Sequence, residues 1–279
     1  VIDVVMEAPE RFTSEVRAAF ESEAGVFYPS MFRQRFQFAE RMDHHAFAAQ
    51  LDRIRLRGSD GVVIKAPDVK EIKAAVERLA AIDIPVFTLV TDLPGSSRLA
   101  YAGMDNRAAG RTAAYLVNLA LGNEGGRVLV TLSSTQFRGE EERVAGFRDA
   151  LGQEYPRLTM VEISEGFGRD EQTGRLASAA LAGHQDVCAI YSAGGANRSL
   201  LDAFSQANRT CRAFVAHDLD ADNRALLAER RINFVLHHDL KADIRNVYRM
   251  LLEQHRMLPL SKSPPLSEIG IFTPFNFPD

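Results

Sequence analysis

The sequence predicts an α/β protein built as two doubly wound lobes, each with a parallel sheet covered by helices. Short apolar runs rich in β-branched residues alternate with longer amphipathic segments along nearly all 279 residues, a pattern typical of parallel sheets. The spacing between the apolar runs at residues 62–64 and 86–87 recurs, within a residue, between 189–190 and 214–215. Because 279 residues is also long for one core, we expect one lobe from each half of the chain.

The apolar and amphipathic patterns place the elements in order. In the first half, strands are expected at residues 1–6, 32–38, 60–64, 85–90 and 99–102, and helices at 10–23, 44–57 and 68–81. In the second half, strands are expected at 127–132, 158–163, 187–191, 212–216, 233–236 and 269–272, and helices at 105–121, 140–151, 170–181, 196–207, 220–228 and 240–254. Asp68 is expected to cap the helix that follows it, because its side chain can accept from free N–H groups there.

The stretch from 84 to 121 marks the passage between the lobes. Its two strands follow one another without a full helical crossover, and Asp105 and Asn106 are expected to accept from N–H groups at the start of the next helix. Two further crossovers are expected near 237–240 and in the Pro/Ser-rich stretch near 261–265. The predicted lobes are therefore 1–104 with 239–263, and 105–238 with 264–279.

Composition restricts the possible functions. The chain is 46% hydrophobic and 25% charged, with a net charge of −4 and scattered Lys and Arg, which argues against a nucleic-acid surface on this segment. It has no apolar run of the ~18 residues that would span a bilayer, so no membrane partner is expected. Residues 1–6 resemble a strand rather than a secretion signal. Cys188 and Cys211 are expected to be buried free thiols.

Polar side chains and aromatic rings follow nearly every predicted strand, where ligands bind in open parallel sheets. These residues are Glu7, Arg11 and Phe12; Lys65; Thr91 and Asp92; Ser133, Thr135, Phe137 and Arg138; Gly194, Gly195 and Asn197; His217 and Asp218; and His237, His238 and Asp239. Taken singly, most would be solvated loop residues. Their concentration at strand ends instead favours a site for a small sugar or polyol. Carboxylates and guanidinium groups form hydrogen bonds with the hydroxyls of such ligands.

Other chemistry has less support. Neighbouring residues of a strand point to opposite faces, so only part of the histidine clusters at 217–218 and 237–239 could converge on a metal. The sequence has no nucleophile elbow, phosphate-binding loop or zinc-protease helix, and we expect no catalytic residue, metal or cofactor. The turn Gly194–Gly195 before a helix could hold an anion, although such turns are equally often only a matter of backbone geometry.

Two segments carry a family resemblance. The segments TLVTDLPGSSRLAYAGMDNRAAGRTAAYL (88–116) and GEEERVAGF (139–147) resemble the effector-binding region of lactose-repressor-family transcription regulators. These regulators share the type I periplasmic-binding-protein fold with the sugar-binding proteins of importers. The resemblance implies that Arg143 reaches ligand hydroxyls, that Asp218 contacts the ligand, and that His238 stands where many members have Gln or Asn. Thr91 and Asp92 lie near the family's Asp-Arg pair without matching it. Without the resemblance, Arg143 would be expected on the surface, paired with Glu140.

The leading interpretation is the effector-sensing domain of a cytoplasmic transcription regulator, with a helix-turn-helix domain expected before residue 1. It would bind a sugar-like effector between its lobes and act on operator DNA as a homodimer. The alternative is a periplasmic sugar-binding protein of an ABC importer. The expected ligand-binding residues are Arg11, Phe12, Asp92, Arg138, Arg143, Asn197, Asp218 and His238. Aromatic and apolar residues offered for the dimer interface are Met31, Phe32, Phe36, Phe272, Phe275 and Phe277, with packing inside the monomer as the alternative.

Overall fold

The computed structural model describes residues 1–122, 124–260 and 266–277, which form two compact units. Unit 1 comprises Val1–Met104, Gln136–Arg138 and Asp239–Glu268, and unit 2 comprises Asp105–Thr135, Gly139–His238 and Ile269–Asp279. Each unit contains its own sheet, so the predicted α/β fold with two sheet-containing lobes is confirmed. The crossover predicted near 261–265 lies outside the described residues.

Unit 1 is built on a parallel sheet of five strands in the order β2-β1-β3-β4-β5. The strands are β1 (Ile2–Glu7), β2 (Gln34–Ala39), β3 (Gly61–Lys65), β4 (Val86–Leu89) and β5 (Ala100–Ala102). As the pattern predicts, β4 and β5 are linked without a helix, and they are neighbours in the same sheet. The carboxyl ends of all five strands therefore lie along one edge, where polar side chains can meet.

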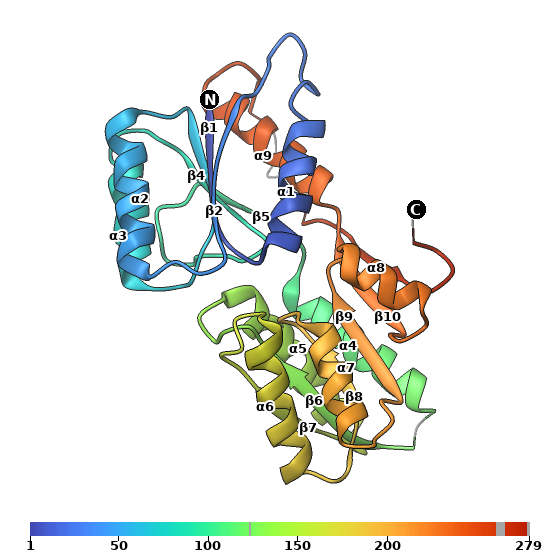
Figure 1. The fold of residues 1–279 in the computed structure, drawn as a ribbon. Helices are drawn as coiled ribbons and strands as arrows, with labels where there is room; N and C mark the ends of the chain where they lie inside the picture. Colours follow the sequence, from blue (N-terminus) through green and yellow to red (C-terminus); the bar gives the residue numbers. More distant parts are fainter. Residues whose placement is uncertain (123, 261–265, 278–279) are drawn as a thin grey trace. The chain divides into compact units, whose positions relative to one another are not determined.

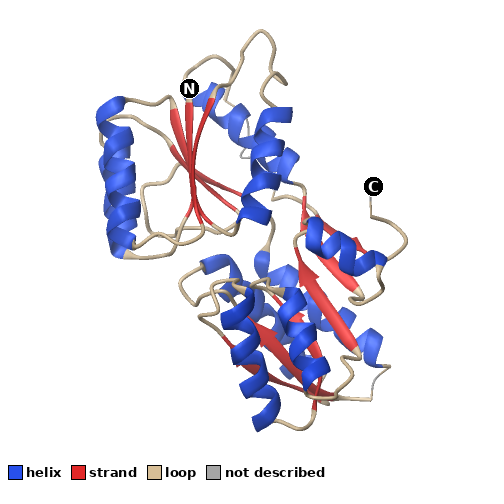
Figure 2. Ribbon diagram, viewed as in Figure 1, coloured by secondary structure: helices blue, strands red, loops and turns tan. Residues whose placement is uncertain are grey.

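Helices cover both faces of this sheet (Figure 1). They are α1 (Glu10–Ser22), α2 (His44–Arg57), α3 (Lys70–Ala80) and α9 (Leu240–Gln254). Side chains alternate between the faces of a strand, so Val4 of β1 packs with α1 and α9, whereas its neighbour Val5 packs with α2 and α3. Figure 2 shows the same layering, with helices flanking the strands. The strand-end edge is thereby held between two rigid helical layers.

One expectation for unit 1 needs correction, and for Phe32 the alternative of packing inside the monomer is observed. Asp68 does not cap α3: Val69 occupies the N-cap position without a side-chain hydrogen bond, and Asp68 instead pairs with Lys73 at 2.7 Å. The aromatic residues near β2 are largely used inside the unit, because Phe32 stacks on Tyr248 with ring centroids 3.9 Å apart. A carboxylate two residues before the helix is better placed for a side-chain ion pair than for a cap.

Unit 2 is built on a six-stranded sheet in the order β11-β10-β9-β8-β6-β7. Its strands are β6 (Gly126–Thr131), β7 (Leu158–Ile163), β8 (Val187–Ser192), β9 (Ala213–His217), β10 (Phe234–His238) and β11 (Ile269–Phe272). All neighbouring pairs are parallel except β10 with β11. The predicted parallel sheet is confirmed, with one antiparallel strand that the returning chain segment adds at this edge.

The helices of unit 2 divide between the two faces of its sheet. They are α4 (Asn106–Leu121), α5 (Arg138–Gln153), α6 (Asp170–Gly183), α7 (Asn197–Gln206) and α8 (Ala221–Ala228). The helices α6, α7 and α8 share one hydrophobic core with Ile190 of β8, whereas Phe147 of α5 stacks on the next residue, Tyr191. Neighbouring side chains of β8 therefore face different helical layers, whereas the residues that follow the strands lie beyond the edge of the sheet.

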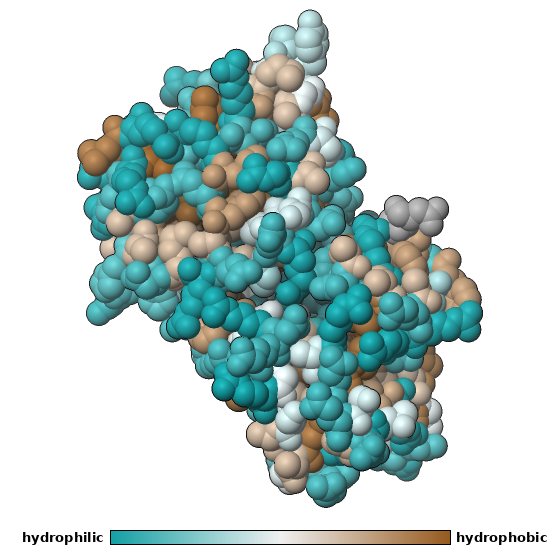
Figure 3. Space-filling model, in the orientation of Figure 1, coloured by the Kyte–Doolittle hydropathy of each residue, from teal (hydrophilic) through white to brown (hydrophobic). Residues whose placement is uncertain are grey.

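The surface of the described chain is mixed in character. Hydrophilic residues predominate on the face shown in Figure 3, and hydrophobic residues are exposed there in scattered patches. Among the described helices, none is both long enough and apolar enough to cross a membrane. Cys188 and Cys211 are free thiols that are half-buried rather than fully buried, and burial raises the pKa of Cys211 to about 12.

Candidate functional site

Arg143 and Asn106 form the first contact at the carboxyl end of the unit 2 sheet. Arg143 is 3% exposed and its Nε donates to Asn106 Oδ1 at 2.8 Å. Asn106 is therefore not a helix cap as expected: Asp105 caps α4 by accepting from the Ala108 N–H at 2.9 Å, which leaves the Asn106 side chain for Arg143. Among the described residues Arg143 has no carboxylate partner, so a buried guanidinium keeps donors for another group.

The alternative of a surface Arg143, which would hold without the resemblance, does not fit its burial. Glu140 accepts hydrogen bonds from the Ser133 backbone N–H at 2.6 Å and from the Ser133 hydroxyl at 2.7 Å. These bonds hold the chain that leaves β6 against the start of α5. Gly194 permits the close approach of the neighbouring strand end, because a Cβ there would lie 2.1 Å from the Ser133 nitrogen.

A buried aromatic pair lies next to Arg143, between α5 and the sheet. Phe147, one helical turn after Arg143, stacks on Tyr191 with centroids 4.7 Å apart. The Tyr191 hydroxyl lies 2.9 Å from Nε2 of His217, the last residue of β9. Burial, and then the nearby Arg143, lower the pKa of His217 well below its usual value, so its imidazole is neutral at physiological pH.

The peptide after β9 has an unusual and firmly held conformation. Asp218 has a φ of 66°, a left-handed conformation that is uncommon outside glycine. Its N–H donates to the Leu236 carbonyl, and Asn223 Nδ2 donates to the carbonyls of both His217 and Asp218. The Asn223 Oδ1 in turn accepts from Asn197 Nδ2 at 2.6 Å. This clamp fixes the directions of the side chains at the strand end.

Three side-chain atoms of this cluster are buried without a hydrogen-bond partner among the described residues. They are Asn197 Oδ1, His217 Nδ1 and Asp218 Oδ1. A buried polar atom left without a partner costs about 1–3 kcal/mol, so such atoms gather where a ligand or water completes them. Asp218 Oδ1 also lies 3.6 Å from Nε2 of the buried His238. Together with Arg143, the cluster can donate to and accept from several hydroxyls.

Unit 1 has its own polar strand ends. Glu7 ends β1 and is 7% exposed, and its carboxylate accepts from the Met42 N–H at 3.2 Å. Burial raises the pKa of Glu7 although Met42 and the cation Lys65 oppose the shift. Lys65 ends the neighbouring strand β3, donates to the Glu7 carbonyl at 3.0 Å and lies over the Phe137 ring at 4.1 Å. These groups bring both charge signs to this edge.

Asp92, after β4, has an arginine partner that the sequence pattern did not reveal. Arg98 Nη2 donates to Asp92 Oδ2 at 2.6 Å and Arg98 Nε binds the other carboxylate oxygen. Asp92 Oδ1 also accepts hydrogen bonds from Thr88 Oγ1 at 2.8 Å and from the Leu93 N–H at 2.7 Å. Burial works against ionisation, but these donors prevail and lower the pKa of Asp92. The arginine stands six residues further along, so matching adjacent positions missed it.

The eight predicted ligand-binding residues divide between the units. Arg11, Phe12, Asp92 and Arg138 belong to unit 1, and Arg143, Asn197, Asp218 and His238 belong to unit 2. The structure brings the last four into one strand-end cluster. Phe12 packs in the core of unit 1, and Arg138 is exposed as the first residue of α5. The prediction that all eight line one cavity stays a prediction.

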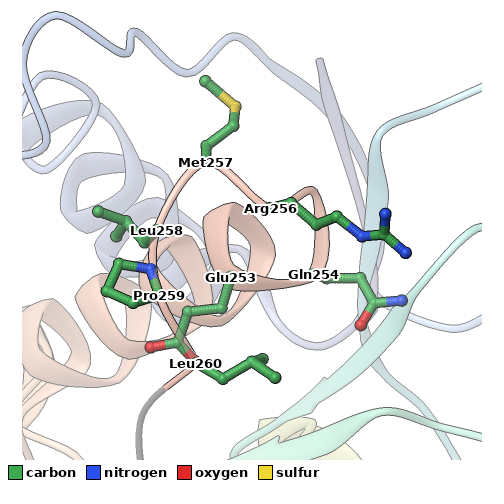
Figure 4. A pocket seen from close by; sticks show the side chains of 7 residues that line it. All are labelled: Glu253, Gln254, Arg256, Met257, Leu258, Pro259 and Leu260. Carbon is green, nitrogen blue, oxygen red and sulfur yellow. The ribbon is translucent and has the colours of Figure 1, made fainter.

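A separate cavity of about 550 Å³ lies at the end of α9 in unit 1 (Figure 4). Its lining residues are Glu253, Gln254, Arg256, Met257, Leu258, Pro259 and Leu260. His255, in the same segment, contacts the carbonyl of Asp60, which directly precedes β3. The cavity therefore lies near the amino ends of the strands, and it is distinct from the polar strand-end groups around Glu7 and Lys65.

Solved structures with the same fold include proteins of two functional kinds. A glucose-galactose binding protein from Geobacillus stearothermophilus aligns with a TM-score of 0.86 at 19% identity, covering 99% of this chain and 98% of that chain. An ABC transporter solute binding protein from Agrobacterium vitis, bound with α-D-tagatopyranose, has a TM-score of 0.86 at 17% identity, covering 98% and 94%. A candidate LacI transcriptional regulator from Bacteroides fragilis has a TM-score of 0.82 at 14% identity, covering 98% and 96%.

At these identities the likenesses establish the fold, which is that of the type I periplasmic-binding proteins. No curated protein has a sequence that matches this chain. The family described as periplasmic binding protein domain matches residues 4–255, which is most of the chain. The chain belongs to the periplasmic binding protein domain family.

Proposed function

We propose that this protein is a sugar-binding receptor of the kind that serves ABC importers, and that it binds without chemical conversion of the sugar. The observation that carries the proposal is the strand-end cluster of unit 2, where Asn197, His217 and Asp218 each have a buried atom without a partner among the described residues. Arg143 adds guanidinium donors beside the acceptor oxygens of Asn197 and Asp218. Paired acceptors and donors of this kind suit the hydroxyls of a sugar.

The ligand is proposed to be neutral, because the charges at the strand ends within each unit are already balanced. In the unit 2 cluster the guanidinium of Arg143 and the carboxylate of Asp218 have opposite charges, and the neutral His217 adds none. In unit 1 the carboxylate of Asp92 is already matched by Arg98. A strongly charged ligand would bring a charge that no group of these balanced clusters offsets, which is costly in a partly buried site. Two of the structurally similar proteins bind neutral sugars, which supports the same class of ligand.

A thermal-shift screen tests the proposal. The panel contains D-glucose, D-galactose, D-tagatose, D-fructose, L-arabinose, D-ribose and the charged comparator D-galacturonate. A neutral sugar at 100 times its dissociation constant stabilises the folded state by about 2.7 kcal/mol and should raise the melting temperature by several degrees. A shift with D-galacturonate alone, or with none of the panel at 10 mM (roughly the upper range for such binding), would contradict the proposal.

A second candidate is the effector-sensing domain of a transcription regulator. The resemblance of residues 88–116 and 139–147 to lactose-repressor-family regulators supports it, as does the fold shared with the candidate LacI regulator. This function would place the protein in the cytoplasm as a homodimer that acts on operator DNA through a helix-turn-helix domain. Tyr28, Met31 and Phe275 are 86%, 68% and 82% exposed and could contribute to such an interface.

Light scattering at micromolar concentration separates the two candidates. A stable dimer, with or without D-galactose, would favour the regulator, because an operator with two half-sites requires two reading units. A monomer under both conditions would favour the importer receptor. The sequence encoded upstream of Val1 gives an independent readout, since a helix-turn-helix and a secretion signal are easily distinguished.

A further inference from the structure

The contact between Tyr191 and His217 determines which hydrogen-bonding group His217 offers at the strand end. Tyr191 is fully buried and His217 is 5% exposed. Their side chains meet at 2.9 Å between the Tyr191 hydroxyl and His217 Nε2, on neighbouring strands of the unit 2 sheet. The other ring nitrogen, Nδ1, is buried without a partner among the described residues. Half of this imidazole is therefore fixed, and the other half, on the last residue of β9, lacks a partner among the described residues.

The tautomer of His217 follows from counting the buried hydrogens. If Nε2–H donated to Tyr191, the phenolic proton would be buried without an acceptor, because His217 is the only partner of that hydroxyl in the described part of the chain. If Tyr191 donates instead, its proton is satisfied and the ring proton lies on Nδ1. The second arrangement leaves one donor without a partner, and an oxygen at the strand end satisfies it completely. The first arrangement leaves both the phenolic proton and the Nδ1 lone pair without a partner, whereas the second leaves only Nδ1–H, so the second arrangement is favoured.

We propose that His217 is a ligand-binding residue which donates a hydrogen bond from Nδ1–H to a sugar oxygen, and that Tyr191 is the positioning residue which fixes this tautomer. The proposal rests on the proposed sugar-binding function and names a specificity-determining contact within it. The contacted atom must be an acceptor, either a hydroxyl or a ring oxygen.

Neighbouring groups hold the His217 ring, and therefore the direction of its Nδ1–H, in a fixed position. The Asn223 clamp on the carbonyls of His217 and Asp218 fixes the backbone that carries the ring. Phe147 stacks on the Tyr191 ring with centroids 4.7 Å apart, which restricts the motion of the phenol. Because neutral imidazole is the form that this buried site favours, the donor persists across the physiological pH range.

Nitrogen NMR tests the tautomer without any ligand. The chain has 7 histidines, and in protein labelled with ¹⁵N-histidine the signals that disappear in His217→Asn identify this residue. We expect Nδ1 to show the shift of a protonated ring nitrogen and Nε2 that of an unprotonated one. Tyr191→Phe should produce a mixture of tautomers. A His217 protonated on Nε2 in the wild type would overturn the proposal, whether or not a sugar binds.

Matched substitutions test the contact itself. The amide of His217→Asn can replace Nδ1–H, whereas that of His217→Gln reaches the Nε2 position. For the neutral sugar that binds most tightly among D-glucose, D-galactose and D-tagatose, calorimetry should show affinity within about threefold for Asn and a loss of roughly five- to twentyfold for Gln and for His217→Leu. Thermal melts of the unliganded variants measure any loss of folding separately.

The two proposals fail in distinguishable ways. If none of the three sugars binds to the wild type, sugar binding fails for this set, and the NMR experiment still decides which nitrogen donates. If a sugar binds and the Gln and Leu variants bind it as tightly as the Asn variant, the proposed contact is overturned while the receptor function stands. Unequal affinities in the expected order, with the Nδ1–H tautomer, support both.

Discussion

Two glycines at the crossing of α4 and α5 connect the fold of unit 2 to its candidate ligand-binding cluster. A Cβ added at Gly110 would lie 1.8 Å from the Arg143 carbonyl oxygen, and one added at Gly146 would lie 2.0 Å from the Arg107 carbonyl oxygen. Both distances are far below the 3.4 Å at which ordinary contact begins. The helices are therefore in backbone contact, and the position of Arg143 depends on that contact.

Gly110→Ala should destabilise the protein by about 2 kcal/mol. Overpacking costs about 1–3 kcal/mol, and the upper end applies here because the struck atom is backbone and cannot rotate away. Against this, alanine gains about 1 kcal/mol of helix propensity over glycine. Gly152→Ala is the matched control, because it lies in α5 and its Cβ meets nothing within 4 Å. It should stabilise by roughly 0.5–1 kcal/mol.

Urea unfolding followed by circular dichroism measures both changes, and calorimetry with D-galactose measures the effect on the site. Gly110→Ala should also weaken sugar binding, because a displaced α5 moves the Arg143 guanidinium, whereas Gly152→Ala should leave affinity unchanged. A Gly110→Ala variant at least as stable as the wild type would refute the backbone contact. A destabilised variant with unaltered affinity would refute the dependence of Arg143 on the crossing.

Three further outcomes are expected. Arg143→Ala should weaken sugar binding by about 1.5–3 kcal/mol by calorimetry, the scale for hydrogen bonds to a charged group, whereas Arg148→Ala, an exposed arginine on the same helix, should not. Because the pKa of Glu7 is raised, the folded state holds a proton that the unfolded state has released, and the stability of the folded state falls as pH rises above about 4.5. Glu7→Gln should therefore raise the melting temperature at pH 7 more than at pH 4.5. Equal shifts at the two pH values would contradict this. Arg98→Ala removes the donors that lower the pKa of Asp92, so it should cost about 1 kcal/mol at pH 7 after solvent screening and progressively less as pH falls towards 3.8.

The sequence predicts most elements because their hydrophobic periods are strong. The expected bounds of α2, β7, α9 and β11 coincide with those observed, and the remaining elements differ by one to a few residues at their ends. Helix starts were less predictable, because several polar residues near a start compete for the same N–H groups. Asp105 rather than Asn106 caps α4, and Asp68 forms an ion pair with Lys73 instead of a cap.

The strand-end location of the site is predictable, but its internal contacts are not. The resemblance pointed to Arg143, yet its burial and its bond to Asn106 depend on how two helices cross. The contact between Tyr191 and His217 joins residues 26 positions apart, and only the register of β8 against β9 brings them together. The pair of Asp92 and Arg98 depends on the backbone path of the turn between them, which cannot be inferred from residue types.

The unpartnered atoms also determine how ligand binding should appear in stability measurements. In the unliganded chain, the cost of Asn197 Oδ1, His217 Nδ1 and Asp218 Oδ1 is borne by the folded state. The unfolded chain hydrates the same atoms, so the clamp by Asn223 and the left-handed Asp218 hold groups in place that solvent would otherwise satisfy. A sugar that completes them removes this cost only from the folded state. Binding and unfolding are therefore linked through the same atoms, and a sugar that fits the cluster should raise the melting temperature more than an equally concentrated sugar lacking one of the contacted hydroxyls.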